Sequence, residues 1–417
     1  MNNKKILLIS HNFSPEPIGI GKYNGEMLLW LANRGYDCTV ITTFPYYPYW
    51  KVQAPYNNLW YKKELMYVGE GKPYLTIYRC PSYIPKDPTG KQRAIQDFSY
   101  WLSKFLMIFK FIVSKRNYDL IITIAPPFHL AYLGLILRKL NGGKLLYHIQ
   151  DMQIEAARDL KLFARKRILA GLFKVEYSIL RGADYVSSIS EGMIKKIKSK
   201  VNREIVFFPN WVDTKDYFPI ADRHLLKNKW GFNSDDIVLL YSGAVGVKQG
   251  LEGILVTAEN LQHDHRHIKF VICSSGPYNE LLMEQAKKKK LRNISFLPVQ
   301  AKEVFNEFLN MADLHLVLQK ANAGDLVMPS KLTTILAVGG ASIITASKGT
   351  SLYDMVVEQN FGYIVEPGKH ELLTKLIIDI KLDDNLERKR INARNYATKY
   401  LNVDTVMNDF VENFLAN

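Results

Sequence analysis

The sequence predicts an α/β protein built from two Rossmann-like, doubly wound parallel-sheet domains that face each other across a cleft. Its 417 residues exceed one ordinary α/β domain and suit two domains of roughly 200 residues each. Short apolar runs also alternate with helix-like segments twice, first from residue 5 and again from about residue 236. Such alternation is typical of βαβ units, whose strands form a parallel sheet covered by helices.

The first domain is predicted to span residues 1–213 and to form six strands. After one helix at Gly25–Arg34, the segment Phe44–Arg93 is rich in Tyr, Pro and Lys and shows little period. Because a connection of this length is often functional, we interpret it as a lid or as an insertion that faces the acceptor, the second substrate. The predicted strands are Lys5–Ser10, Cys38–Thr43, Leu120–Ala125, Lys144–Ile149, Tyr185–Ile189 and Ile205–Phe208.

The second domain is predicted to span residues 214–399. It follows a polar, charge-mixed stretch that runs from about residue 214 to 235. The tail holds two expected helices, and we expect residues 400–417 to pack back against the first domain. The predicted strands are Ile237–Ser242, Ile268–Cys273, Ile294–Leu297, Leu314–Leu318 and Ser342–Thr345.

The excess positive charge lies entirely in the first half of the chain. Residues 1–200 hold 30 basic and 14 acidic side chains, a balance of +16, whereas residues 201–417 have a balance of −1. This asymmetry indicates an anionic partner such as lipid headgroups, a pyrophosphate-linked acceptor or nucleic acid, with a merely lysine-rich surface as the alternative. The three cysteines are far apart, which indicates neither a disulfide framework nor a zinc site and fits a reducing cytoplasm.

One apolar run, residues 98–113, remains open to two interpretations. Lys104 and Lys110 interrupt it, so it falls short of the roughly 18 apolar residues that a spanning helix needs. The run therefore predicts either a helix that lies on a membrane surface or a helix buried in the core of the first domain.

Two glycine-containing loops are candidates for binding an anion. Gly19 and Gly21 follow the first strand, where backbone amides at a helix start can approach a charged group. A dinucleotide fingerprint is disfavoured because Asn24 occupies the third glycine position, while a flexible turn stays possible. In the second domain, Gly243 and Gly250 flank Lys248, which could neutralise a diphosphate, although ordinary βα turns also contain glycine.

Two further groups of polar residues follow predicted strands. Asp325, Ser330 and Lys331 precede a helix expected at residues 333–338 and could bind a sugar and its phosphate together, unless they only start that helix. His148 and Asp151 end a strand of the basic domain, where Asp151 could orient His148 or bind an acceptor hydroxyl.

These loops together resemble family 4 of the retaining GT-B glycosyltransferases. More narrowly, the chain is similar to the colanic-acid-type fucosyltransferase branch of bacterial exopolysaccharide synthesis. The resemblance spans residues 5–340, and its motifs are Asn12–Glu16, Gly19–Tyr23, Pro45–Pro48, His148–Asp151, Phe207–Trp211, Tyr241–Gly243, Lys248–Gly250 and Pro329–Leu332.

The resemblance implies a nucleotide-sugar donor held mainly by the second domain and an acceptor met by the first. It implies no cofactor and no metal, a GDP-sugar or UDP-sugar as donor, and a nucleobase near Val299 bound through backbone groups. The catalytic residues are then expected to be His148, Asp151 and Asp325. The donor-binding residues are expected to be Gly19, Gly21, Asn210, Gly243, Lys248, Gly250, Val299, Ser330, Lys331, Leu332 and Thr334.

The chain departs from the family pattern at two places. Members commonly use a Glu-x7-Glu pair, but Asp325 stands near the place of the first acid and Thr334 at that of the second. A threonine can offer only one hydroxyl for ribose recognition. Gln249 also replaces the usual lysine before Gly250, with Lys248 one position earlier.

The expected function is transfer of fucose or an N-acetylated 6-deoxyhexose to a lipid-linked oligosaccharide in exopolysaccharide, capsule or O-antigen synthesis. The expected location is the cytoplasm, at the anionic inner face of the cell membrane. A nucleotide-sugar epimerase or hydrolase on the same fold is one alternative, because a fold does not determine the chemistry. A non-catalytic nucleic-acid-binding protein is the other, although no common nucleic-acid module is recognisable in the sequence.

Overall fold

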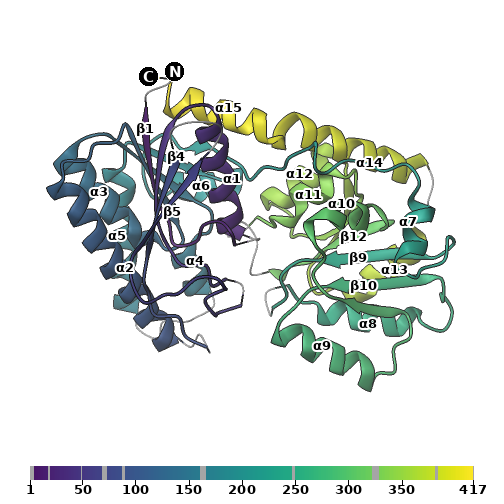
Figure 1. Ribbon diagram of the computed structural model, residues 1–417. Helices are drawn as coiled ribbons and strands as arrows, with labels where there is room; N and C mark the ends of the chain where they lie inside the picture. The colour runs from purple at the N-terminus through teal and green to yellow at the C-terminus, as the bar shows by residue number, and fades with distance from the viewer. Residues whose placement is uncertain are drawn as a thin grey trace. The chain divides into compact units, whose positions relative to one another are not determined.

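The chain forms two compact units, each built around one sheet (Figure 1). The computed structural model describes residues 4–16, 19–47, 49–67, 73–86, 90–159, 166–246, 249–321, 328–380 and 384–416. The first unit comprises Met1–Pro209 with Met407–Asn417, and the second comprises Asn210–Val406.

The sheet of the first unit has eight strands in the order β3-β4-β2-β1-β5-β6-β7-β8. All neighbouring strands are parallel except β3, which pairs antiparallel to β4 at the edge. The strands are β1 (Lys5–Ile9), β2 (Asp37–Thr43), β3 (Lys62–Tyr67), β4 (Pro73–Cys80), β5 (Leu120–Ala125), β6 (Lys144–Ile149), β7 (Tyr185–Ser188) and β8 (Val206–Phe207).

Helices cover both faces of this sheet, with α2, α3 and α5 on one face and α1 on the other (Figure 1). Ile6, Leu7, Leu8 and Ile9 of β1 are consequently fully buried. A strand buried on both sides needs a continuous apolar run, and such runs made these strands predictable. The helices are α1 (Gly19–Asn33), α2 (Gly90–Val113), α3 (Ala131–Asn141), α4 (Gln153–Asp159), α5 (Lys166–Gly182) and α6 (Glu191–Lys198), and the last helix, α15 (Val403–Phe414), begins in the second unit and ends in the first.

The second unit has a parallel sheet of six strands in the order β11-β10-β9-β12-β13-β14. Successive residues of β9 alternate between two cores, since Val238 and Leu240 pack on one side and Leu239 and Tyr241 on the other. The strands are β9 (Ile237–Ser242), β10 (Ile268–Cys273), β11 (Ile294–Leu297), β12 (Leu314–Val317), β13 (Ser342–Thr345) and β14 (Gly362–Val365). The helices are α7 (Arg223–Lys229), α8 (Glu252–Leu261), α9 (Pro277–Lys288), α10 (Lys302–Asn310), α11 (Lys331–Ala337), α12 (Ser351–Gln359), α13 (His370–Asp379) and α14 (Asp384–Tyr396).

The division between the units falls at Pro209, because Val212 already pairs with the end of the second unit. The Val212 N–H donates to Leu401 O at 2.8 Å, and the Val403 N–H donates to Val212 O at 3.0 Å. The last residues of the chain pack in the first unit instead. The Phe410 ring lies 5.0 Å from the Phe208 ring, and the Phe414 ring lies 5.3 Å from the Tyr185 ring.

The eleven predicted strands are confirmed to within one residue at each end, but three strands were missed. The expectation that Phe44–Arg93 is irregular is wrong, because this segment contributes β3 and β4 to the sheet. β4 was missed because Arg79, a charged residue, occupies a buried position of this strand and interrupts its apolar run. The third missed strand, β14, begins with Gly362 and is fully buried only at its two ends.

The first helix begins at Gly19, six residues earlier than predicted. Gly19 and Gly21 are therefore part of the first turn of α1 and not of a free loop. Gly19 has φ +62°, which a residue with a side chain rarely adopts, so the chain enters the helix through a glycine-dependent turn.

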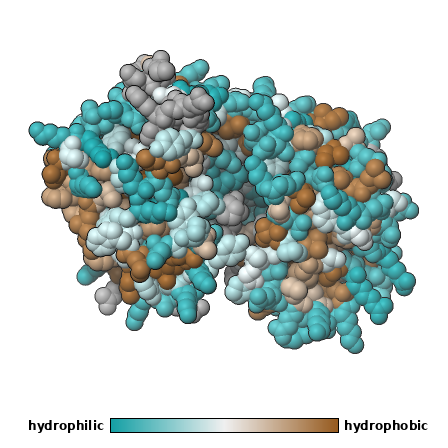
Figure 2. Space-filling view, in the orientation of Figure 1, coloured by the Kyte–Doolittle hydropathy of each residue, from teal (hydrophilic) through white to brown (hydrophobic). Residues whose placement is uncertain are grey.

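The apolar run 98–113 lies on α2, whose two faces differ. Tyr100, Met107, Ile108 and Phe111 are buried in the unit. The opposite face exposes large apolar side chains at intervals of three or four residues, namely Ile95, Phe98, Leu102, Leu106, Phe109 and Val113. On the side of the molecule shown in Figure 2, hydrophilic surface predominates and apolar side chains form separate patches. Among the described residues, none of the helices is both long and apolar enough to span a membrane.

Candidate functional site

Both sheets present polar side chains beyond the carboxyl ends of their strands, which is where ligands bind in open α/β sheets. In the first unit these side chains follow β1, β2, β5 and β6. In the second unit they follow β9, β10 and β12 and begin α11.

Glu16 fastens the segment after β1 to the segment after β2. Its carboxylate is buried and accepts hydrogen bonds from the N–H groups of Tyr46 at 3.1 Å and Tyr47 at 3.0 Å. Asn12 Nδ2 donates to the same carboxylate at 2.8 Å. Burial raises the pKa of Glu16, while these three hydrogen bonds oppose that rise because they favour the charged form.

Gly21 is required by the packing of Glu16. A Cβ atom at position 21 would lie 2.7 Å from Glu16 Oε2, so any side chain would displace the carboxylate. This packing explains without any ligand why residue 21 is a glycine. Contact between Gly21 and the donor remains a prediction.

Arg79 of β4 ties the inserted segment to the same edge. Its guanidinium donates to Ser14 O at 2.8 Å and to Thr43 O at 3.3 Å, and it forms an ion pair with Glu64 at 2.8 Å. Arg79 is buried, so these partners compensate for the loss of hydration of its charge.

His148 is buried inside the first unit, where its Nδ1 lies 2.9 Å from Ser187 Oγ. Burial lowers the pKa of His148 to about 3, so the imidazole is neutral at physiological pH. Ser187, and not Asp151, is thus the hydrogen-bond partner that orients Nδ1. Asp151 is half-buried and lies close enough to Tyr47 to raise the pKa of that phenol.

Lys104 and His11 belong to a buried cluster that the sequence did not reveal. The Lys104 Nζ lies 4.6 Å from the centroid of the Tyr100 ring and has no hydrogen-bond partner among the residues described here. Burial lowers the pKa of Lys104 to about 8. His11 Nε2 lies 2.6 Å from Tyr46 Oη, and burial with the nearby Lys104 lowers the pKa of His11.

His129, which follows β5, completes this cluster. Its ring stacks on Tyr100 with centroids 5.9 Å apart, and burial together with Lys104 lowers the pKa of His129 to about 4. The only sequence signal for the cluster is the position of His11 and His129 just after strands, because in the sequence Lys104 only interrupts an apolar run.

In the second unit, Lys331 lies against the glycine loop after β9. Its Nζ is buried, sits 3.3 Å from the centroid of the Tyr241 ring, and lacks a hydrogen-bond partner within the described part of the chain. A Cβ atom at Gly243 would lie 3.1 Å from this Nζ. Burial lowers the pKa of Lys331 well below its usual value. A buried cation of this kind is suited to receiving an anion.

The loop that borders Lys331 is held by Ser274, which sequence reasoning missed, and by Tyr241, which it had quoted only as part of a motif. Ser274 Oγ donates to Gly243 O at 2.7 Å, and Tyr241 Oη donates to Ala244 O at 2.6 Å. Both residues stand at strand ends, and the loop conformation depends on them. Gly243 itself has φ +136°, which further favours glycine there.

The predicted donor-binding residues at the start of α11 differ in their exposure and in their hydrogen bonds. Ser330 is exposed, whereas the Leu332 side chain is buried in the core, so only the backbone of Leu332 could meet a ligand. The Thr334 hydroxyl donates to Lys331 O at 3.0 Å. At the position of the family's second acid, this chain therefore has a hydroxyl that is bonded to its own helix.

The structure also describes three further predicted residues, Gly250, Val299 and Asn210. Gly250 has φ +66° and borders Lys320, since a Cβ there would lie 3.2 Å from Lys320 Cγ. Val299 is exposed, and Asn210 is buried at the first residue of the second unit. Lys248 and Asp325 lie outside the described residues.

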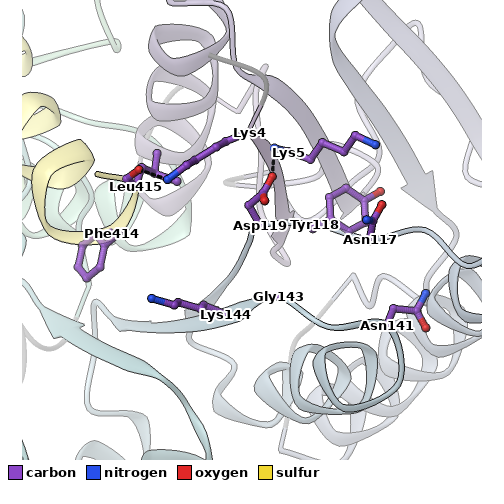
Figure 3. Close-up of a pocket in the computed structure, with 10 residues that line it drawn as sticks. All are labelled: Lys4, Lys5, Asn117, Tyr118, Asp119, Asn141, Gly143, Lys144, Phe414 and Leu415. Atoms are coloured by element: carbon purple, nitrogen blue, oxygen red, sulfur yellow. Dashed lines mark hydrogen bonds between the residues drawn. The ribbon is translucent and has the colours of Figure 1, made fainter. Parts of the chain in front are cut away.

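A groove of about 380 Å³ in the first unit lies at the opposite edge of the sheet (Figure 3). Lys5, Asp119 and Lys144 place it at the amino ends of β1, β5 and β6. The Lys5 N–H donates to Asp119 Oδ2 at 2.6 Å, and Lys4 Nζ donates to Leu415 O. The groove is therefore separate from the predicted site residues. In the stretches for which the structure gives side chains, no group of three or more His, Cys, Asp or Glu is arranged to hold a metal ion.

Comparison with known proteins identifies relatives over nearly the whole chain. The family described as "Glycosyl transferases group 1" matches residues 222–399. A relative in Escherichia coli (strain K12), described as "Putative colanic acid biosynthesis glycosyl transferase WcaI", is 36% identical over 418 aligned positions and 98% of each chain.

Solved structures share the arrangement of elements at low sequence identity. Sucrose-phosphate synthase from Thermosynechococcus elongatus matches with a TM-score of 0.77 and 17% identity, over 99% of this chain and 98% of that one. Anabaena HepE, crystallised with UDP and glucose, matches with a TM-score of 0.69 and 15% identity, over 99% of both chains. At these identities the similarity concerns the fold.

Replacing Lys104 by methionine should stabilise the protein at pH 7. The lysine pKa is lower in the folded chain than in the unfolded chain, so the charged form destabilises folding below about pH 8 and the penalty disappears as pH rises toward 10. A shift of this size corresponds to about 3 kcal/mol. As the pH is raised from 7 to 10, the Tm of the parent should rise relative to the Tm of Lys104→Met, as measured by thermal unfolding. Parallel curves would contradict a buried, unpaired ammonium.

Proposed function

The chain belongs to the group 1 glycosyltransferases of GT-B fold, and we propose on that premise that it builds a cell-surface polysaccharide. It would transfer fucose or an N-acetylated 6-deoxyhexose from a GDP-sugar or UDP-sugar to a lipid-linked saccharide. The relative named for colanic acid biosynthesis, which is 36% identical, supports a place in exopolysaccharide, capsule or O-antigen synthesis. The proposed location is the cytoplasmic face of the membrane.

The observation that carries the proposal is the buried Lys331 ammonium beside Gly243. Its surroundings supply an aromatic face and a glycine backbone, and the described residues give it no anion. A donor diphosphate at this position would supply the missing negative charge through charge-assisted hydrogen bonds. Lys248 and Asp325 are proposed to complete the donor site, with the diphosphate charge met by lysines and backbone amides and without a metal ion.

The proposed transfer keeps the configuration of the donor sugar. The bond from the anomeric carbon to the diphosphate oxygen breaks, and the acceptor hydroxyl oxygen bonds to that carbon on the same face. The acceptor proton passes to the departing phosphate oxygen, which leaves a nucleoside diphosphate and a glycosylated acceptor. The protein then needs chiefly to stabilise the leaving group and to position both substrates.

On the acceptor side we assign Asp151 and His148. Asp151 is half-buried and carries a carboxylate that can accept a hydrogen bond from an acceptor hydroxyl. His148 is neutral because of its burial, and its Nδ1 is engaged by Ser187. A neutral imidazole held in this way can contribute a hydrogen bond but no positive charge.

We propose that α2 attaches the protein to an anionic membrane surface. Its exposed face is apolar, with Phe98 66% and Phe109 55% accessible, while its other face packs in the core. The excess of 30 basic over 14 acidic residues in the first 200 favours anionic lipid as the covering partner, at on the order of 1 kcal/mol per basic residue near the surface.

Replacing Lys331 by methionine should weaken binding of UDP or GDP about tenfold to a hundredfold, because a charge-assisted hydrogen bond is lost. Isothermal titration calorimetry measures the change. The matched control is Lys288→Met, which removes an exposed lysine of the same unit and should leave affinity unchanged. At alkaline pH, where the lowered pKa leaves part of Lys331 uncharged, donor binding to the parent should also take up protons, because the diphosphate would raise that pKa.

Proton uptake is measured by repeating the calorimetry in HEPES and Tris buffers, whose ionisation enthalpies differ and which bring no competing phosphate. Binding of Lys331→Met at parental affinity would show that Lys331 is not a diphosphate ligand. Failure of the parent to bind any of UDP, GDP, dTDP or their sugar conjugates would contradict the proposed function itself.

The double substitution Phe98→Glu with Phe109→Glu should abolish sedimentation with anionic liposomes, because it places charge on the apolar face of α2. The parent should sediment at low salt and much less at high salt or with neutral liposomes. The control Leu225→Glu with Val357→Glu alters equally exposed apolar residues of the second unit and should sediment like the parent. A parent that stays in solution with anionic liposomes would refute the attachment. Circular dichroism should be unchanged in all variants.

A further inference from the structure

Trp50, in the segment after β2, has a backbone conformation that costs energy. Its φ is +52°, in the left-handed region that bulky residues avoid. Conformations of this kind cluster at functional sites, where the surrounding structure enforces them. The donor site proposed above makes no use of Trp50.

The turn that contains Trp50 is anchored on both sides through its backbone. Glu16 accepts the N–H groups of Tyr46 and Tyr47, the Lys51 N–H donates to Tyr46 O at 3.4 Å, and the Gln53 N–H donates to Pro45 O at 3.0 Å. These hydrogen bonds hold the turn without involving the indole ring. They would hold it equally well around a glycine, which adopts this φ at little cost.

The indole ring lies between aromatic and charged neighbours. It meets the Tyr46 ring edge-on with centroids 5.6 Å apart, and the Arg93 guanidinium carbon lies 5.5 Å from its centroid. Trp50 is half-buried and Arg93 is exposed, so both remain accessible.

Two carboxylates stand near these rings. Asp97, one turn after Arg93 on α2, accepts a hydrogen bond from Tyr100 Oη at 3.1 Å. Asp151 and Arg93 both lie close enough to Tyr47 to influence its pKa. Burial and the carboxylates of Glu16 and Asp151 raise the pKa of Tyr47, and Arg93 lowers it. Asp97 is also close to Tyr46 and to Arg93, so side chains from three separate segments bring one cation and two acids next to the aromatic rings of this turn.

This chemistry fits a sugar ring better than an anion. A hexopyranose has one face of C–H groups that can pack on an aromatic ring, and hydroxyls along its edge. Guanidinium and carboxylate groups form strong hydrogen bonds with such hydroxyls. A phosphate would be repelled by two neighbouring carboxylates.

We propose that Trp50, Arg93 and Asp97 form a saccharide-binding platform, with the sugar ring stacked on the indole and its hydroxyls bound by the two charged groups. The platform deepens the proposed function. It rests on that function only in identifying the bound sugar as part of the acceptor. Saccharide binding itself can be measured independently of transfer.

The test compares Trp50→Gly with Trp60→Gly in the full-length protein. Trp60 belongs to the same inserted segment, is 75% exposed, and stacks edge-on against Tyr61. The probes are the methyl glycosides of glucose, galactose, mannose and fucose, with binding measured by saturation-transfer NMR. We expect Trp50→Gly to weaken binding at least tenfold and Arg93→Met to weaken it several-fold, while Trp60→Gly binds like the parent.

Stability separates a binding role from a structural role. Because glycine relieves the strained φ, the Tm of Trp50→Gly should stay within about 2 °C of the parent or exceed it. A marked fall in Tm would show that the ring is structural and would overturn the proposal. Unchanged glycoside binding in Trp50→Gly and Arg93→Met, or no glycoside binding by the parent, would overturn it as well.

Nucleotide binding, measured in parallel by calorimetry, distinguishes the two proposals. A parent that binds UDP or GDP but no glycoside leaves the donor site standing and removes the platform. A parent that binds glycosides through Trp50 but no nucleotide supports the platform and contradicts the transferase function.

Discussion

The polar edge of the first sheet depends on two buried charges, the Glu16 carboxylate and the Arg79 guanidinium. Glu16 holds the backbone of the turn after β2, and Arg79 holds the carbonyl groups of Ser14 and Thr43. A buried charge is tolerated only when hydrogen bonds replace its lost hydration, so each charge requires the loops to keep one arrangement. The inserted strand β4 belongs to this network because it supplies Arg79. The network also determines the position of Trp50, because Glu16 anchors the turn that contains this residue.

The buried lysines differ in whether the folded chain provides a partner for their charge. Lys227 pairs with Asp313 at 2.8 Å, and its Nζ also donates to Asp236 O at 2.7 Å, so its charge is satisfied within the folded chain. Lys331 and Lys104 have no such partners in the regions that the structure describes. Removing one member of a satisfied pair destabilises a protein, whereas an unsatisfied cation is itself a cost that a bound anion or deprotonation removes. The contrast assigns Lys227 to stability, and it is the reason why Lys331 is proposed as a ligand of the donor.

The sequence revealed the sheets because strands covered on both faces consist of unbroken apolar runs, as in Ile6–Ile9. Prediction from the sequence failed where a single charged residue occupies a buried position. Arg79 obscured β4, and Lys104 seemed to interrupt a helix whose buried face it occupies. The glycines were noticed but not explained, since the need for Gly21 arises from contact with Glu16, five residues away in the chain. Such reasons depend on distances that spacing along the chain does not contain.

Thr334 shows how a chain can keep a fold and change a site. The common family pattern would place an acid there, but here the hydroxyl is bonded to Lys331 O and is not free to imitate a carboxylate. Recognition of a ribose would then need another group at this edge. Glu252 at the start of α8 offers a carboxylate that accepts a hydrogen bond from Tyr278 and lies near Lys320, which in turn borders Gly250. Structures that match at 15 to 17% identity show a shared fold alone, so the donor preference of this chain must be decided by its own residues.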